Sequence, residues 1–160
     1  MGSWHQFRLT YGKPYPMNRL LNSTVFIVDD DPFTCSLYQK HLLNLGFTNT
    51  HLFHSGVECL NHLHLNPEII LLDHDMSQIN GFEVLKKIKR YDPDASIIMV
   101  SGQEDMATAL DALKYGAFDY IIKGDTEVQR IEHTLFRLAR LKEMMDRRST
   151  SLLSKLMPNG

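Results

Sequence analysis

The sequence predicts a doubly wound α/β fold built on a parallel sheet, and three observations indicate it. Between about residues 23 and 146, short runs rich in β-branched residues alternate with longer segments of helical spacing. Five such strand–helix units follow one another, which is typical of a parallel sheet with helices on both faces. The strand-like runs are largely apolar, as expected for strands that are buried on both faces.

Five short segments are the predicted strands. Each is a run of apolar or β-branched residues, and each is followed by polar or turn-forming residues. They are Val25–Val28, Thr50–Phe53, Ile69–Leu72, Ile97–Val100 and Tyr120–Ile122.

Local signals bound the first two predicted helices. Asp31 and Pro32 predict an N-cap followed by a first-turn proline, and Gly46 is expected to end this helix. Ser55 is expected to cap a second helix that ends before Pro67.

The remaining helices are predicted from their apolar spacing. A third has an apolar face of Phe82, Leu85 and Ile88 and ends at Asp92–Pro93. A fourth is expected from about Glu104 to Tyr115, ending at Gly116. The last carries one apolar stripe, formed by Val128, Ile131, Leu135 and Leu138.

Composition limits the class of protein. The 160 residues suffice for one domain, and 43% hydrophobic with 22% charged residues is a globular composition. A net charge of −2 predicts no general attraction to nucleic acid, and no apolar run is long enough to predict membrane insertion. There is no signal-peptide pattern, and Cys35 and Cys59 suit a reducing compartment, so we expect a cytoplasmic protein.

The two ends of the chain differ from its middle. Residues 1–22 have no clear period and are expected to be an N-terminal extension or a segment left from expression. Residues 23–146 are the predicted domain, and residues 147–160 are expected to be a C-terminal tail or the start of a linker. The predicted last helix continues its stripe through Leu141 and Met145, which would allow a homodimer.

Polar residues follow four of the five predicted strands. In doubly wound sheets the reactive site lies beyond the carboxyl ends of the strands, so these residues are expected to converge. They are Asp29, Asp30 and Asp31 after the first strand, Asp73, His74 and Asp75 after the third, Ser101 after the fourth and Lys123 after the fifth.

Carboxylates, a hydroxyl and an ammonium at one edge suit phosphoryl transfer to a carboxylate. Carboxylates held together repel unless a cation joins them, and Mg²⁺ binds such pockets through carboxylates and water. One Asp could attack the phosphorus in line, while the Lys and Ser hold the remaining phosphoryl oxygens.

The same segments resemble the receiver domains of two-component response regulators over about residues 23–140. The motifs VFIVDDDP, IILLDHDMSQINGFEVL, IIMVSGQED and YGAFDYIIKG occur in the family's order. The resemblance implies a flavodoxin-like sheet with strand order 2-1-3-4-5.

The resemblance also implies a role for each site residue. Asp73 takes the phospho-acceptor role, and Asp29, Asp30, Asp73 and the backbone carbonyl of Asp75 would bind Mg²⁺. Lys123 is the family's lysine, and Ser101 and Tyr120 would form the switch.

A signalling function follows from these roles, rather than an enzyme beyond the domain's own phosphoryl acceptance and hydrolysis. A histidine kinase or histidine phosphotransfer protein would be the phosphodonor. Phosphorylation would remodel the surface of the fourth helix, fifth strand and fifth helix. The chain would act on a downstream partner or a fused output domain.

Two positions depart from the family's pattern. Gly124 follows Lys123 where the family usually has proline, so we expect a trans peptide and a looser turn there. Ser77 also stands where proline is common, which leaves the loop after Asp73 freer.

Two other functions fit part of the pattern. Asp73 and Asp75 match the DxD of haloacid-dehalogenase-like phosphatases, but the acidic pair comes first in this chain and last in theirs. A pseudo-receiver that binds a partner without phosphorylation is the other alternative, and the complete set of site residues argues against it.

Overall fold

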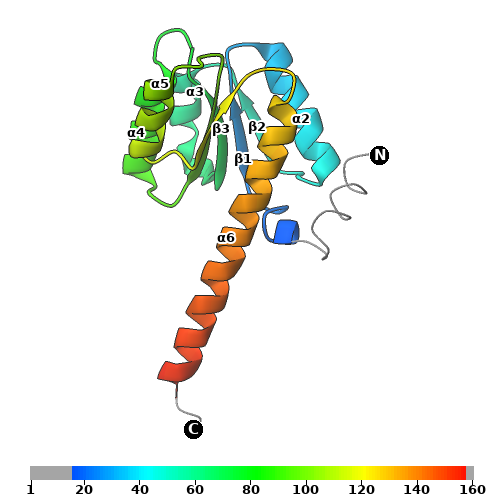
Figure 1. The fold of residues 1–160 in the computed structure, drawn as a ribbon, viewed down its shortest axis with the longest axis vertical. Coiled ribbons are helices and arrows are strands. Elements are labelled where there is room, and N and C mark those ends of the chain that lie inside the picture. Colours follow the sequence, from blue (N-terminus) through cyan, green and yellow to red (C-terminus); the bar gives the residue numbers. More distant parts are fainter. Residues whose placement is uncertain (1–15, 158–160) are drawn as a thin grey trace.

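The computed structural model describes residues 16–157, which form a five-stranded parallel sheet between two layers of helices (Figure 1). The order across the sheet is β2-β1-β3-β4-β5, and each neighbouring pair is parallel. The predicted α/β class and strand order are therefore confirmed. The strands are β1 (Val25–Val28), β2 (Thr50–Phe53), β3 (Ile69–Asp73), β4 (Ser96–Ser101) and β5 (Asp119–Ile122).

Helices cover both faces of the sheet, with α2 and α6 on one face and α3, α4 and α5 on the other (Figure 1). No helix among residues 16–157 is both long and apolar enough to span a bilayer. The helices are α2 (Pro32–Leu45), α3 (Gly56–Asn61), α4 (Gly81–Tyr91), α5 (Met106–Lys114) and α6 (Glu127–Leu156), with short 3₁₀ turns η1 (Pro16–Arg19) and η2 (Leu63–Leu65).

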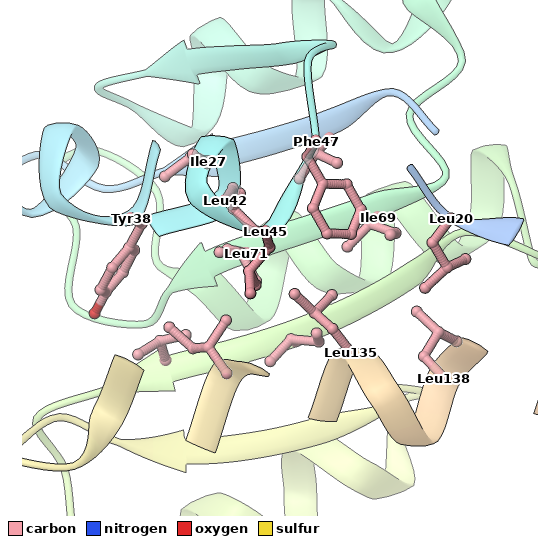
Figure 2. Packing of buried hydrophobic residues seen from close by; sticks show 14 of the residues in the cluster. Leu20, Ile27, Tyr38, Leu42, Leu45, Phe47, Ile69, Leu71, Leu135 and Leu138 are labelled. Atoms are coloured by element: carbon pink, nitrogen blue, oxygen red, sulfur yellow. The ribbon is translucent and has the colours of Figure 1, made fainter. Parts of the chain in front are cut away.

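The core has two halves because side chains alternate across each strand. On β1, Val25 and Ile27 pack toward α2 and α6, whereas Phe26 and Val28 pack toward α3 and α4. Figure 2 shows the first half, where side chains of α2, α6 and the strands interdigitate. Both faces are thus apolar, which leaves the carboxyl edge of the sheet for polar side chains.

Most predicted helix ends are confirmed by their hydrogen bonds. The Asp31 carboxylate accepts a hydrogen bond from the Phe33 N–H, and Gly46 ends α2 in the left-handed conformation with φ of 102°. The α5 helix begins two residues later than expected, at Met106, because Asp105 is its N-cap and accepts from the Thr108 N–H.

The second predicted helix is shorter than expected. The chain leaves α3 at Asn61, tightens into the 3₁₀ turn η2 and reaches Pro67 through Asn66, whose φ is 53°. A left-handed residue interrupts the helical path, so no single helix reaches the proline.

The structure continues past both expected domain boundaries. The N-terminal segment packs into the core, and the last helix extends beyond residue 146. Residues 1–15 lie outside the described residues, but Met17 and Leu20 of the N-terminal segment are buried in the α2–α6 half of the core. Residues 147–156, expected to be a tail or linker start, continue α6 as regular helix. Figure 1 shows α6 running well past the sheet, and Arg19 pairs with Asp146 at 2.7 Å where η1 meets it.

Candidate functional site

Three carboxylates gather where β1 and β3 end. Val28 and Leu72 are register partners in adjacent parallel strands, so the next residues, Asp29 and Asp73, lie side by side. One carboxylate oxygen of each of these residues and of Asp30 lies within 4.8 Å of the others. Asp29 and Asp73 are buried, whereas Asp30 is exposed. The predicted acidic residues are therefore together at one edge of the sheet.

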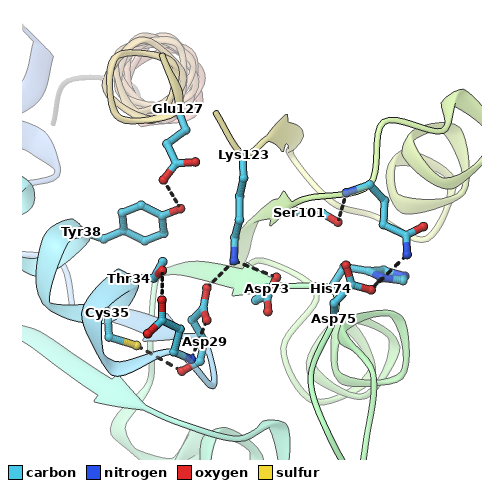
Figure 3. Close-up of polar contacts among 12 residues, drawn as sticks. Asp29, Thr34, Cys35, Tyr38, Asp73, His74, Asp75, Ser101, Lys123 and Glu127 are labelled. Atoms are coloured by element: carbon cyan, nitrogen blue, oxygen red, sulfur yellow. Dashed lines mark hydrogen bonds and ion pairs between the residues drawn. The ribbon is translucent and has the colours of Figure 1, made fainter. Parts of the chain in front are cut away.

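Lys123 reaches this cluster from β5 (Figure 3). Its Nζ donates to Oδ2 of Asp29 at 2.7 Å and lies 3.3 Å from Oδ1 of Asp73. β3 and β4 stand between β5 and β1, so only a long side chain that extends along the edge can make this contact. One ammonium thus neutralises part of the charge of two buried carboxylates.

Burial and charge act in opposite directions on these groups. Burial and the neighbouring Asp29 raise the pKa of Asp73, and Lys123 offsets only part of that. Burial disfavours the charged Lys123, but the hydrogen bond that it donates to Asp29 and the attraction of Asp73 outweigh burial and raise the pKa of Lys123. The lysine therefore stays cationic, and Asp73 holds a proton more readily than an ordinary Asp.

Ser101 and Tyr120 meet at the backbone of Gln103. Ser101, which is fully buried at the end of β4, accepts the Gln103 N–H at Oγ over 3.1 Å. The Tyr120 hydroxyl donates to the Gln103 carbonyl at 3.0 Å, and its ring is only 7% exposed. The aromatic ring of the predicted switch thus already lies inward, bound to the loop that follows Ser101.

Asp75 contributes its backbone and its side chain to different contacts. Its backbone acts on the Asp73 carboxylate and lowers the pKa of that group, against the effects that raise it. Its own carboxylate, which is 49% exposed, accepts from Gln103 Nε2 at 3.2 Å and lies 3.1 Å from Nδ1 of His74. The side chain is therefore held at the rim of the site, on the side of the loop that follows β4.

Gly81 allows the loop after β3 to close. Its N–H donates to the His74 carbonyl at 2.9 Å. A Cβ at this position would collide with the Asp73 carbonyl oxygen and would lie 2.7 Å from the His74 Cα. The absence of a side chain at the start of α4 lets the helix pack directly against the backbone that carries Asp73.

Residues 25–135 match the family model described as the response regulator receiver domain. The chain belongs to this family. The match includes every strand of the sheet. It also includes the residues at the carboxyl ends of β1, β3, β4 and β5, which are Asp29, Asp73, Ser101 and Lys123.

Named relatives agree with the family model. The chain is 33% identical over 112 residues to the transcriptional regulatory protein ZraR of Salmonella typhimurium, which covers 69% of this chain but only 25% of ZraR. It is 31% identical over 104 residues to the chemotaxis protein CheY of Thermotoga maritima, covering 64% of this chain and 87% of CheY. The chain thus spans about a quarter of one relative and most of the other.

A solved structure shows the same fold. The CheX–CheY–BeF₃–Mg²⁺ complex from Borrelia burgdorferi has a chain that superposes with a TM-score of 0.67 at 24% identity. The superposition covers 81% of this chain and 92% of that chain.

Membership in the family supports the signalling interpretation. Receiver domains of two-component systems serve phosphorylation-dependent signalling and bind Mg²⁺ at an acidic pocket. Neither the phosphatase nor the pseudo-receiver alternative is favoured by the match.

The acidic pocket of this receiver domain fits a divalent cation. Three carboxylate oxygens converge, and carboxylate oxygen is the ligand that Mg²⁺ prefers. Asp30 is exposed, so a bound cation could keep part of its water shell. Two of the three carboxylates are buried with a single lysine as counter-charge, which leaves net negative charge for a cation to neutralise.

Sequence reasoning missed three residues in the surroundings of the site. Gln103 touches Ser101, Tyr120 and Asp75, and it stands three positions after Val100, the predicted end of the fourth strand. Tyr38 and Glu127 join α2 to the loop after Lys123. No local pattern in the sequence indicated Tyr38 or Glu127, because their hydrogen bond joins residues 89 positions apart.

Proposed function

We propose that this receiver domain is a phosphorylation-dependent switch in which Asp73 accepts a phosphoryl group with Mg²⁺ bound at the acidic pocket. The observation that carries the proposal is the contact of the Lys123 ammonium with both Asp29 and Asp73. A buried carboxylate beside a fixed cation and two further carboxylates suits in-line attack on a phosphorus atom.

The chemical step is a transfer to the Asp73 carboxylate. One carboxylate oxygen forms the new P–O bond while the bond from phosphorus to the donor's leaving group breaks. The leaving group keeps that electron pair and takes a proton. Asp29, Asp30, Asp73 and the backbone carbonyl of Asp75 would hold Mg²⁺, which neutralises charge that develops on the phosphoryl oxygens. Lys123 and Ser101 would bind those oxygens, and water later hydrolyses the acyl phosphate.

The donor and the output are proposed from the family. A histidine kinase or a histidine phosphotransfer protein would supply the phosphoryl group, and the domain would catalyse only its own phosphorylation and hydrolysis. Cys35 and Cys59 are free, buried thiols, which supports a reducing compartment such as the cytoplasm. A downstream protein or a fused output domain would respond.

The proposed response is a change on the surface of α5, β5 and α6. A phosphoryl group on Asp73 would draw the Ser101 hydroxyl away from the Gln103 N–H. Gln103 also binds Tyr120 and Asp75, so one event at Ser101 would shift the loop before α5.

A second copy of the chain is the proposed partner for the exposed apolar part of α6. Leu138, Met145 and Leu152 recur at seven-residue intervals, typical of paired helices. Leu138 is buried against the sheet, but Met145 and Leu152 are 58% and 61% exposed where α6 leaves the body. A second copy of the chain would cover this continuation of the buried face.

Mass spectrometry after treatment with acetyl phosphate and Mg²⁺ tests the function. The expected result is one added phosphate that requires Mg²⁺, is removed by hydroxylamine and is absent from Asp73→Ala. A phosphate of the same lability on Asp73→Ala would reject the assignment of the acceptor. NMR with a beryllofluoride mimic tests the switch, with shifts expected over residues 101–124 rather than at the metal ligands alone.

A further inference from the structure

The turn that follows Lys123 is exposed at residues 124–126. Gly124 directly follows the lysine, and a Cβ built there would meet nothing within 4 Å. The Lys123–Gly124 peptide is trans. Lys123 itself is tied to β4 through its N–H, which donates to the Ser101 carbonyl at 2.8 Å. Since residues 124–126 bury no side chain, further hydrogen bonds are what fixes the turn beyond that bond.

Glu127 supplies those hydrogen bonds. Its Oε2 accepts the Gly124 N–H at 2.8 Å, and its own N–H donates to the Gly124 carbonyl at 3.2 Å. The two residues therefore hold each other reciprocally across the turn that leads into α6. A proline in place of Gly124 would have no N–H to donate, so this arrangement requires a residue other than proline at position 124.

The other oxygen of Glu127 connects this turn to α2. Oε1 accepts the Tyr38 hydroxyl at 3.0 Å, and the Tyr38 ring is only 3% exposed in the core (Figure 3). α2 begins at Pro32, directly after the acidic residues of β1. One carboxylate thus bridges the segment that follows Asp29 and the segment that follows Lys123.

We infer that Glu127, together with Tyr38, is a positioning residue that fixes the Lys123 ammonium relative to Asp29 and Asp73. The inference rests on the proposed function, since Lys123 must meet phosphoryl oxygens at Asp73. Without the bridge, the turn after Lys123 loses its only contact with α2 among the hydrogen bonds described for Gly124 and Glu127. The lysine then samples positions that do not suit transfer.

Four variants separate positioning from stability. E127A removes both hydrogen bonds. E127Q retains the bridge, because its amide oxygen can accept from Gly124 and its amide N–H can donate to the Tyr38 hydroxyl oxygen. Y38F keeps the buried ring and removes one hydrogen bond. Q129A changes an exposed residue of the same helical turn and is the matched control.

Two measurements read the bridge independently. The initial rate of phosphate uptake from acetyl phosphate at saturating Mg²⁺ should fall about 10-fold in E127A and several-fold in Y38F, because small misplacements of catalytic groups are costly. E127Q and Q129A should stay within about twofold of wild type. Calorimetry should give the same Mg²⁺ affinity for all variants, since the metal ligands are untouched.

Hydrogen exchange of the Gly124 amide, followed by NMR without phosphodonor, should accelerate at least roughly tenfold in E127A and not in Q129A. E127A/Y38F should lose no more rate than E127A alone, because both act through one bridge. If E127A does not fold, Y38F carries the same test with the ring in place.

The outcomes distinguish this inference from the function on which it rests. A wild-type protein that takes up no phosphate on Asp73 overturns the proposed function. A wild type that takes it up, with E127A or Y38F at an unchanged rate, overturns the positioning role alone. A parallel loss of rate in E127Q also overturns it.

Discussion

The Lys123 ammonium lies 2.7 Å from the Asp29 carboxylate, although the two residues are 94 positions apart and their strands are not neighbours. The same ammonium is 3.3 Å from Asp73. Asp29 and Asp73 are nearly fully buried, whereas the lysine side chain is 27% exposed. The contact therefore joins β1, β3 and β5 at the point where phosphoryl transfer is proposed.

Lys123→Ala should destabilise the protein in the absence of Mg²⁺. Two buried carboxylates would lose their counter-charge, and removal of one partner of a buried charged hydrogen bond costs about 1–3 kcal/mol. Added Mg²⁺ should restore most of the loss, because it supplies the missing positive charge. Thermal unfolding of both proteins with and without Mg²⁺ measures this. Lys87→Ala, at an exposed position of α4, is the surface control. Equal unfolding temperatures without Mg²⁺ would contradict it.

Asp73→Asn should stabilise the metal-free protein at neutral pH. Burial and Asp29 raise the pKa of Asp73, so the folded state binds the proton more tightly than the unfolded state. The stability associated with this group therefore falls as the pH rises from the unfolded pKa through the folded pKa. An amide avoids that loss, so we expect the variant to be more stable than wild type at neutral pH.

Thermal unfolding from acid to neutral pH checks the sign. The advantage of Asp73→Asn should shrink toward acid pH, where wild-type Asp73 is protonated, and also with Mg²⁺, which binds only the wild-type cluster well. Asp94→Asn, at an exposed position, should show no such pH dependence. A variant that is less stable than wild type at neutral pH would refute the prediction.

Gly81→Ala should destabilise the domain by several kcal/mol. The added methyl group would collide with the Asp73 carbonyl and crowd the His74 backbone, neither of which is a flexible side chain. Gly102→Ala is the matched control, since nothing lies within 4 Å of its Cβ position. Chemical denaturation should show a large decrease for the first variant and a change within about 0.5 kcal/mol for the second. Similar losses in both variants would be inconsistent with the packing.

The exposed part of α6 should mediate concentration-dependent association. Replacing Met145 and Leu152 by Glu places charges on the apolar face and should shift any dimer to monomer, whereas Thr150→Glu should not. Sedimentation velocity over a micromolar range, with and without beryllofluoride, measures this. A wild type that stays monomeric in both states at high micromolar concentration would reject self-association.

Asp75→Asn should prolong or increase phosphorylation of Asp73. A rim carboxylate adds negative charge beside a phosphoryl group, and at about 6 Å the repulsion is of order 3 kcal/mol at a dielectric of 20, before screening. It could also orient the attacking water as a general base, a role worth about 10²–10⁴-fold. Both effects shorten the phosphate's lifetime or lower its yield. The test is the dephosphorylation rate of wild type and Asp75→Asn at the same Mg²⁺ concentration. If the variant loses phosphate at the same rate or faster, and gains no more phosphate, Asp75 contributes only its backbone.

Much of the fold could be predicted because its signals are local. The apolar runs at β1 and β3 mark buried strands, and Asp31 and Gly46 mark the ends of α2 through interactions within a few residues. Parallel strands align their carboxyl ends, so the acidic residues after β1 and β3 were expected to meet, and they do.

Contacts between distant segments were decided only by the tertiary structure. Nothing near Tyr38 in sequence indicates that its hydroxyl meets Glu127, 89 positions later, because that bond depends on how α2 and α6 pack on the same face. Burial of Met17 likewise depends on α6 passing beside η1. The residue types and the edge at which they gather follow from local pattern and strand direction. Which oxygen each hydrogen-bond donor reaches depends on how the helices pack, and the sequence pattern does not encode that packing.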